Sequence, residues 1–128
     1  FIASKNGLTA SPLASAYCTA KASEIHLARC LALETAPSGI RVNVINPDAV
    51  LQGSKIWSGK WLDERMSASN KKNKEDLEEH YKQRSLLKTS VLPVDIAEAA
   101  YFMASDLSSK STGNIINVDS GNIQSFTR

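Results

Sequence analysis

The chain has 128 residues, 42% of them hydrophobic, and its 15 basic and 13 acidic residues leave a formal net charge of +2. This length allows one modest hydrophobic core and is too short for two ordinary domains. The near balance of charge gives no electrostatic case for nucleic acid or an anionic membrane as a partner. No apolar run approaches the length of a membrane-spanning helix.

The first residues, Phe1 to Ser4, form an apolar run that ends in a small polar residue, which is typical of the last half of a buried strand. Because the chain opens on this run and not on a methionine, we interpret the sequence as part of a longer polypeptide. Gly7 and Pro12 punctuate the polar stretch that follows, so we expect a loop there between strand and helix.

The stretch from Ser15 to Glu34 predicts a long helix. It places Tyr17 and Lys21 on the same face, because side chains four residues apart are neighbours on a helix. A phenol is a poor acid or base at neutral pH, since its ordinary pKa is about 10, but a neighbouring cation favours the phenolate. The pair is therefore a candidate proton donor and acceptor. Taken alone, the pattern favours a Tyr and a Lys on a solvated helix face.

Small and apolar residues cover nearly all sides of this helix, so we expect more than one neighbour to bury it and predict a subunit contact there. Cys18 and Cys30 lie about 18 Å apart along its axis, too far for a disulfide. Reduced thiols favour a cytoplasmic location. His26 and His80 stand apart from other potential ligands, so no metal site is predicted.

The next stretch predicts a parallel sheet. Pro37–Gly39 ends the helix, and Ile40–Ile45 is rich in β-branched residues, as strands are. A helix, a short turn and a strand form the second half of a βαβ unit, which implies the α/β class. Asn46, Pro47 and Asp48 then follow at the carboxyl edge of the strand, where ligands bind in such sheets.

The segment from Leu51 to Lys88 is less regular. Trp57 and Trp61 lie at helical spacing, and they either fill a core or cap a substrate pocket. Residues 71–84 carry five positive and four negative charges, which predicts a solvated helix and not a basic patch.

The last third of the chain predicts one more helix and one more strand. Pro93 and Asp95 are typical of the first turn of a helix. An apolar stripe from Ile96 to Leu107 indicates that one face of this helix packs on the sheet. Ile115–Val118 is the final predicted strand.

Together these residues resemble the C-terminal half of a short-chain dehydrogenase/reductase. Five features carry the resemblance in chain order: Ser4 thirteen residues before Tyr17, the Tyr17-x-x-x-Lys21 pair, Gly39–Asn43 leading to Pro47, Pro93–Ala97, and Ala104–Asp106 running to Thr112–Gly113 and Val118–Asp119. They span nearly the whole chain. The resemblance implies that residues 1–128 are part of a Rossmann-like domain, a doubly wound parallel sheet that binds a nicotinamide dinucleotide.

The same resemblance implies roles for individual residues. Tyr17 would act as general acid or base on the substrate oxygen, Ser4 would hydrogen-bond that oxygen, and Lys21 would hold the nicotinamide ribose and favour the phenolate. The cofactor would also contact Pro47, Asp48 and Val50. A serine before a turn is equally typical of a cap on that turn, so Ser4 has a second interpretation.

Some positions depart from the family pattern. Asp48 and Ser120 stand where the family commonly has Gly, and Gln52 stands where a Thr often contacts the carboxamide. The Gly-rich phosphate loop and the residue that selects NAD or NADP belong upstream of Phe1, and residues 1–128 contain no such turn. We therefore predict that the chain by itself binds cofactor weakly and is inactive, and that the whole protein favours NAD over NADP.

A narrower similarity concerns Ile2–Asn6, His26–Cys30 and Asn46–Val50 with the tryptophan segment that follows. These stretches resemble the dehydrogenase domain of bifunctional rhamnulose-1-phosphate aldolase/alcohol dehydrogenases. That likeness implies a small aldehyde or alcohol such as lactaldehyde as substrate and a fused upstream aldolase region, and we expect a homo-oligomer. Two alternatives stay open: another ketoreductase of the superfamily, or a catalytically silent dinucleotide-fold module used for binding or assembly.

Overall fold

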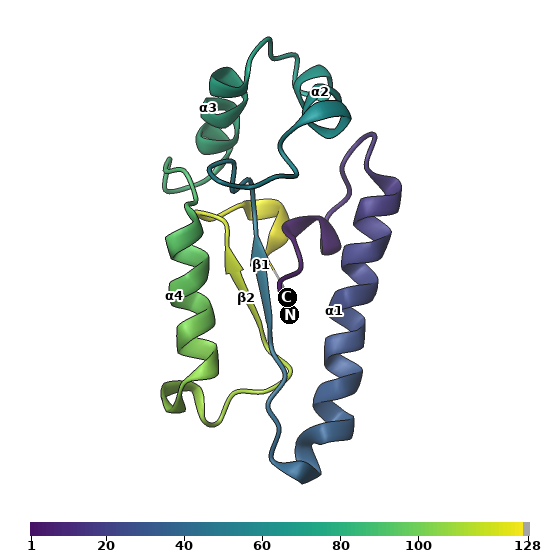
Figure 1. Cartoon of the computed structure of the whole chain (residues 1–128), viewed down its shortest axis with the longest axis vertical. Helices are drawn as coiled ribbons and strands as arrows, with labels where there is room; N and C mark the ends of the chain where they lie inside the picture. The colour runs from purple at the N-terminus through teal and green to yellow at the C-terminus, as the bar shows by residue number, and fades with distance from the viewer. Residues whose placement is uncertain (127–128) are drawn as a thin grey trace.

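Two parallel strands, β1 (Val44–Pro47) and β2 (Ile115–Val118), form the centre of the structure (Figure 1), a computed structural model that describes residues 1–126. Their register pairs Val44 with Ile115 and Pro47 with Val118. On the other side of β1, Ile2 forms a parallel bridge with Ile45, and the Ala3 amide donates to the Ile45 carbonyl at 2.9 Å. The strand predicted at the start of the chain is therefore present only as this bridge.

The start of β1 differs from the predicted strand, which began at Ile40. Before Val44, side chains replace part of the backbone ladder. The Gly113 amide still donates to the Val42 carbonyl at 2.7 Å, but the Val42 amide donates to Thr112 Oγ1 and Asn43 Nδ2 donates to the Ser111 carbonyl. The strand also runs further than predicted, through Pro47, because the Asp48 amide continues the pairing by donating to the Val118 carbonyl at 3.2 Å. Parallel pairing of two strands confirms the α/β class.

Helix α1 (Ser15–Thr35) and helix α4 (Pro93–Ala104) lie on opposite sides of the strands (Figure 1), as in a doubly wound sheet. The helix predicted from Ser15 is confirmed. A core of buried side chains joins α1 to the sheet and comprises Ala3, Ile25, Ala28 and Val44. Within the described chain only this face of α1 is buried, and Leu33 on another face is 82% exposed.

Helix α4 packs on the sheet as its apolar stripe predicts, except at the end of the stripe. The helix ends at Ala104, and Leu107 lies in the following 3-10 turn with 76% of its surface exposed, so its predicted place on the packed face is wrong. Arg41 fixes that turn, because its guanidinium donates to the carbonyls of Ser105 and Ser108.

Helices α2 (Gly59–Ala68) and α3 (Lys74–Arg84) lie beyond the carboxyl end of β1 (Figure 1). We call residues 49–92 the cap and the rest of the described chain the body. Leu77, which is fully buried, anchors α3, and Asn73 caps it by accepting from the Asp76 amide. The solvated helix predicted within residues 71–84 is confirmed, although it begins at Lys74.

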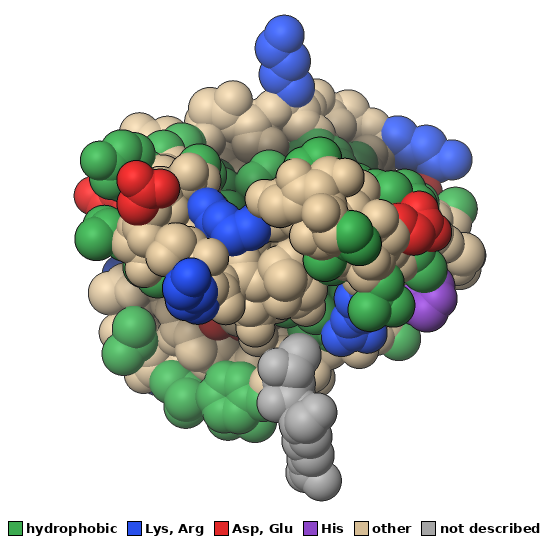
Figure 2. Space-filling view, turned by 90° about the horizontal axis from the view of Figure 1, so that it is seen from below, with side chains coloured by type: hydrophobic (Ala, Val, Ile, Leu, Met, Phe, Trp, Pro, Cys, Tyr) green, Lys and Arg blue, Asp and Glu red, His purple; other side chains and the backbone are tan. Residues whose placement is uncertain are grey.

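The surface carries charges of both signs. On the face seen in Figure 2, lysine and arginine side chains are scattered among acidic and apolar ones and do not gather into one patch. None of the helices within residues 1–126 combines the length and the apolar character that a bilayer crossing requires.

Candidate active site

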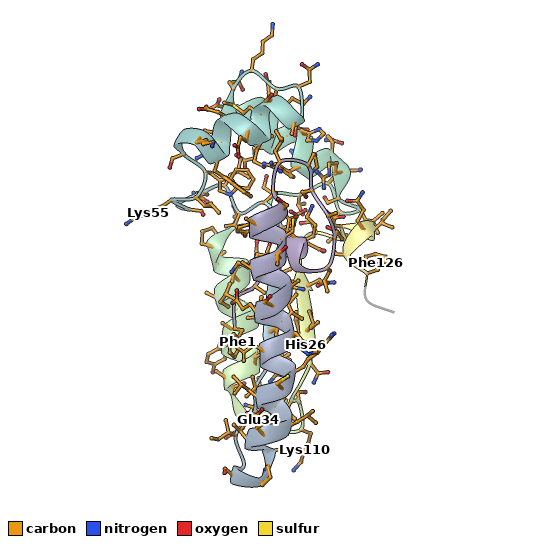
Figure 3. All side chains as sticks on the ribbon, turned by 90° about the vertical axis from the view of Figure 1, so that its right-hand side faces the viewer. Phe1, His26, Glu34, Lys55, Lys110 and Phe126 are labelled. Carbon is orange, nitrogen blue, oxygen red and sulfur yellow. The ribbon has the colours of Figure 1, made fainter. Side chains whose placement is uncertain are left out.

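A cavity of about 410 Å³ opens at the carboxyl end of β1, where the body meets the cap. In Figure 3, α2 and α3 lie above the first turns of α1, and Lys55 projects away from the cap. The body contributes Ser4, Tyr17 and Pro47 to the lining, and the cap contributes Val50, Trp57, Trp61 and Arg65. The volume lies in the range of small-ligand sites.

Ser4 reaches this cavity because the loop after it packs closely on α1. A Cβ atom at Gly7 would lie 2.5 Å from Ile25 Cδ1 and 2.8 Å from the Lys21 carbonyl oxygen, so only glycine permits this approach. Ser4 Oγ accepts a hydrogen bond from the Asn6 amide at 3.1 Å, as the capping interpretation predicts. Its hydroxyl proton is not used by that bond and remains available to a ligand in the cavity.

Tyr17 lies in the first turn of α1 and lines the same cavity as Ser4. Its ring contacts Trp61 of the cap, with centroids 4.8 Å apart and a tilt of 51°. The contact places the phenol at the boundary between body and cap, where a substrate would have the indole on one side.

Lys21 is held at the edge of the site. Its Nζ donates to the Ile2 carbonyl at 3.0 Å and to Glu24 Oε2 at 2.8 Å, and it is not among the residues that line the cavity. The ammonium is thus fixed between α1 and the start of the chain. Its role toward Tyr17 and a cofactor remains a prediction.

Asp48, which departs from the family pattern, has its carboxylate neutralised by the body. Asp48 Oδ1 lies 3.7 Å from Lys5 Nζ, and Oδ2 accepts from Asn122 Nδ2 at 2.7 Å. Burial lowers the pKa of Lys5, and the facing Asp48 partly offsets that effect. The sequence analysis missed Lys5, because only the fold brings it next to Asp48.

Backbone conformation explains one further departure. Ser120 has a φ of +52°, in the left-handed region where glycine is the least strained residue. The family's common glycine at this position therefore reflects a turn that the chain retains. Gln52 lines the cavity, as a residue near the carboxamide would.

The cap residues form an aromatic wall that the sequence signalled only in part. Trp57 packs edge-on against Tyr81 with centroids 5.5 Å apart, and both line the cavity together with Trp61. Of the two interpretations of the tryptophans, the lining of a pocket is confirmed, and a substrate in that pocket stays a prediction. Burial, with Asp48 nearby, raises the pKa of Tyr81. No sequence signal separated Tyr81 or Arg65 from the surrounding charged residues.

Comparison with known proteins decides the family. Residues 1–122 match a family model of short-chain dehydrogenase type, described as enoyl-(acyl carrier protein) reductase. The chain belongs to the short-chain dehydrogenase/reductase family. The resemblance to this family, predicted from the Tyr17-x-x-x-Lys21 pair and the four other features, is confirmed.

Individual relatives agree with the assignment to the short-chain dehydrogenases. The chain is 50% identical over 128 residues to the uncharacterized oxidoreductase YuxG of Bacillus subtilis. The aligned region covers 100% of this chain and 18% of YuxG. The solved carveol dehydrogenase of Mycobacterium avium, in complex with NAD, has a TM-score of 0.83 and 28% identity over 95% of this chain and 44% of its own. A 4-hydroxyisoleucine dehydrogenase complexed with NADH has a TM-score of 0.74 and 30% identity, and the match covers 95% of this chain and 45% of the dehydrogenase.

The carveol and 4-hydroxyisoleucine dehydrogenases hold NAD and NADH, so the fit of this cavity to a nicotinamide cofactor can be examined. The residues fit the nicotinamide end, because Tyr17, Pro47 and Val50 line the cavity and the Asp48 charge is already paired. No stretch of the sequence fits the pyrophosphate, since it has no Gly-rich turn that opens a helix. The chain spans less than half the length of these relatives.

Proposed function

We propose that this chain is the substrate-binding and catalytic half of an NAD(P)-dependent oxidoreductase that interconverts a small carbonyl compound and its alcohol. One observation carries the proposal: Ser4 and Tyr17 line a single cavity together with the segment from Pro47 to Val50. When bound, a nicotinamide would supply or accept the hydride.

The residues of the chain would handle the proton. Tyr17 would give its hydroxyl proton to the substrate oxygen during reduction and take it back during oxidation. Ser4 would donate its free hydroxyl proton to the same oxygen, where negative charge develops in the transition state. Two of the three Lys21 ammonium protons point to Ile2 and Glu24, which leaves one for the ribose of the cofactor.

The cofactor preference and the location are also part of the proposal. The carveol and 4-hydroxyisoleucine dehydrogenases were solved with NAD and NADH, which supports NAD over NADP. Cys18 and Cys30 are free thiols, which supports a reducing, cytoplasmic compartment.

Lactaldehyde is the first substrate to test, with a fused upstream aldolase region in the whole protein. Support comes from the likeness to bifunctional rhamnulose-1-phosphate aldolase/alcohol dehydrogenases and from the relative YuxG. The chain covers 44% of carveol dehydrogenase but only 18% of YuxG, so YuxG contains much more sequence than one short-chain dehydrogenase.

We also propose that the protein is a homo-oligomer. Leu33 and Leu27 on α1 are 82% and 51% exposed, and apolar helix faces of this kind are usually covered by another chain or domain. A monomer in sedimentation at micromolar concentration would contradict this part of the proposal.

The experiment that tests the catalytic role is Tyr17→Phe in the intact protein, with Tyr101→Phe on exposed α4 as the matched control. We expect NADH-dependent carbonyl reduction to fall by roughly 10²- to 10⁴-fold, the usual contribution of a general acid. Cofactor affinity should change little. An unchanged turnover rate would favour the silent binding module instead.

A ketoreductase acting on acyl chains is the second candidate. The description of the matching family model and relatives named 3-oxoacyl-[acyl-carrier-protein] reductase, such as that of Rickettsia felis at 32% identity, favour it. A comparison of kcat/KM for lactaldehyde and for a 3-oxoacyl thioester separates the two.

A further inference from the structure

Arg65, in the last turn of α2, is a buried cation in the lining of the cavity. Only 4% of its surface is exposed, and it lies in the cap wall together with Trp61. No carboxylate of residues 1–126 lies within salt-bridge distance of its guanidinium. The proposed function does not use this residue.

The guanidinium has unused hydrogen-bonding capacity. Nη2 donates to the Pro12 carbonyl at 2.5 Å, and the buried Nε has no partner within the described part of the chain. Cζ lies 4.8 Å from the Trp61 ring centroid, and the buried Trp61 Nε1 likewise lacks a partner. Since a guanidinium carries five N–H donors, most of its capacity is left for a ligand.

The other charged side chains in the lining, Lys5 and Asp48, balance each other, which makes Arg65 exceptional. Lys5 Nζ lies 3.7 Å from Asp48 Oδ1. A buried charge is costly unless a counter-charge or a full set of hydrogen bonds accompanies it. Because the Pro12 carbonyl and the indole supply only partial charges, a ligand anion would complete the site.

We propose that Arg65 binds an oxyanion group, a carboxylate or a phosphate, of the substrate. Tyr17 and Arg65 both contact the Trp61 ring, so the phenol and the guanidinium lie on either part of the same indole. An acyclic molecule with a carbonyl at one end and an oxyanion a few bonds away would reach both. The planar fork of arginine suits such groups.

The inference rests on the proposed function for the carbonyl end alone. It names a substrate class that neutral lactaldehyde does not belong to, because lactaldehyde carries no anionic group. Among small carbonyl compounds, the cavity should therefore prefer acidic ones.

Ligand-observed NMR on the intact protein tests anion binding without turnover. The probes are pentanoate, propyl phosphate and neutral pentanamide, and the variants are Arg65→Met and Arg65→Lys. We expect one or both anions to bind more tightly than pentanamide, and Arg65→Met to weaken that binding by about 10- to 100-fold, the range for a hydrogen bond to a charged group. Arg65→Lys keeps the charge and should lose less.

Arg84→Met is the matched control, since Arg84 also lies over an aromatic ring, 5.0 Å from the Tyr81 centroid, but is exposed and outside the cavity lining. It should leave anion binding unchanged. Equal binding of pentanoate and pentanamide, or anion binding that survives Arg65→Met, would overturn the inference and assign Arg65 to holding the Pro12 loop.

Turnover separates this inference from the proposed function. We expect kcat/KM for 4-oxopentanoate to exceed that for 2-pentanone and lactaldehyde, and Arg65→Met to remove the difference through KM. Tyr17→Phe should slow turnover of all three by the same factor of roughly 10² to 10⁴ while anion binding persists. Equal turnover of acidic and neutral ketones would overturn the inference but leave the proposed function in place. Anion binding at Arg65 without any Tyr17-dependent turnover would overturn the proposed function but leave the inference about anion binding in place.

Discussion

The body and the cap meet at one cavity but are built in different ways. In the body, the parallel strands share a core with the 21-residue helix α1, and side chains such as Arg41 and Asn43 connect segments far apart in sequence. The cap is two short helices with few buried side chains, chiefly Leu51 and Leu77 among the apolar ones.

The family features follow the same division. All five lie in the body, and none lies within residues 49–92. The cap instead supplies the aromatic wall and Arg65. Under the proposed function, the body would fix the type of reaction, whereas the cap would select the substrate.

The largest effect is expected from breaking the cap alone. Leu77→Ala removes the fully buried anchor of α3 and should cost about 2–5 kcal/mol in the free energy of unfolding of the cap. Hydrogen exchange should accelerate in α2 and α3 and remain slow in β1 and the middle of α1. Leu87→Ala, at a 71% exposed leucine, is the control. Equal acceleration in β1 would mean that body and cap unfold as one unit.

A smaller effect is expected from changing the body at the cavity. Ser4→Ala removes a hydroxyl that would donate to the substrate oxygen, and we expect kcat to fall by about 10²-fold with little change in KM. Loss of the hydrogen bond from the Asn6 amide to Ser4 Oγ should cost about 1 kcal/mol in the free energy of unfolding. Ser4→Thr, which keeps the hydroxyl, should recover much of the rate. A kcat within twofold of wild type for Ser4→Ala would contradict the catalytic role and leave Ser4 only the hydrogen bond that it accepts from the Asn6 amide.

The smallest effect is expected in how the stability of the cap depends on pH. Burial, with Asp48, raises the pKa of Tyr81 above its ordinary value near 10, so the folded state keeps a proton that the unfolded chain loses. The folded state then binds more protons, and the free energy of unfolding should fall as pH rises above about 10. Urea denaturation across this range should show a shallower fall for Tyr81→Phe. Tyr101→Phe is the control at an exposed tyrosine, and a wild-type profile for Tyr81→Phe would contradict the prediction.

Much of the fold could be predicted from local patterns, because each pattern has a local physical cause. The β-branched run before Asn46 and the final Ile115–Val118 run gave the two strands, and the helices from Ser15 and Pro93 begin where predicted. The errors fall where distant partners decide. Ile40 to Asn43 is not strand, since side-chain bonds to Ser111 and Thr112 interrupt its backbone pairing, and Leu107 lies outside α4.

The candidate site divides in the same way. Ser4, Tyr17 and the segment from Pro47 to Val50 were named from spacing and resemblance, and they line one cavity. The sequence could not reveal that Lys5 pairs with Asp48, because 43 positions separate them along the chain and only the packing of the loop on α1 brings them together.

By itself the sequence determined the family, the order of helices and strands, and the residue types available for proton transfer, because these depend on short-range periodicity and fixed spacing. The tertiary structure alone decided which charges are neutralised. It pairs Asp48 with Lys5, holds Lys21 against Ile2 and Glu24, and leaves Arg65 buried without a counter-ion among residues 1–126. Coulomb interactions and desolvation depend on distance in space and on burial, and neither is written in the order of residues along the chain.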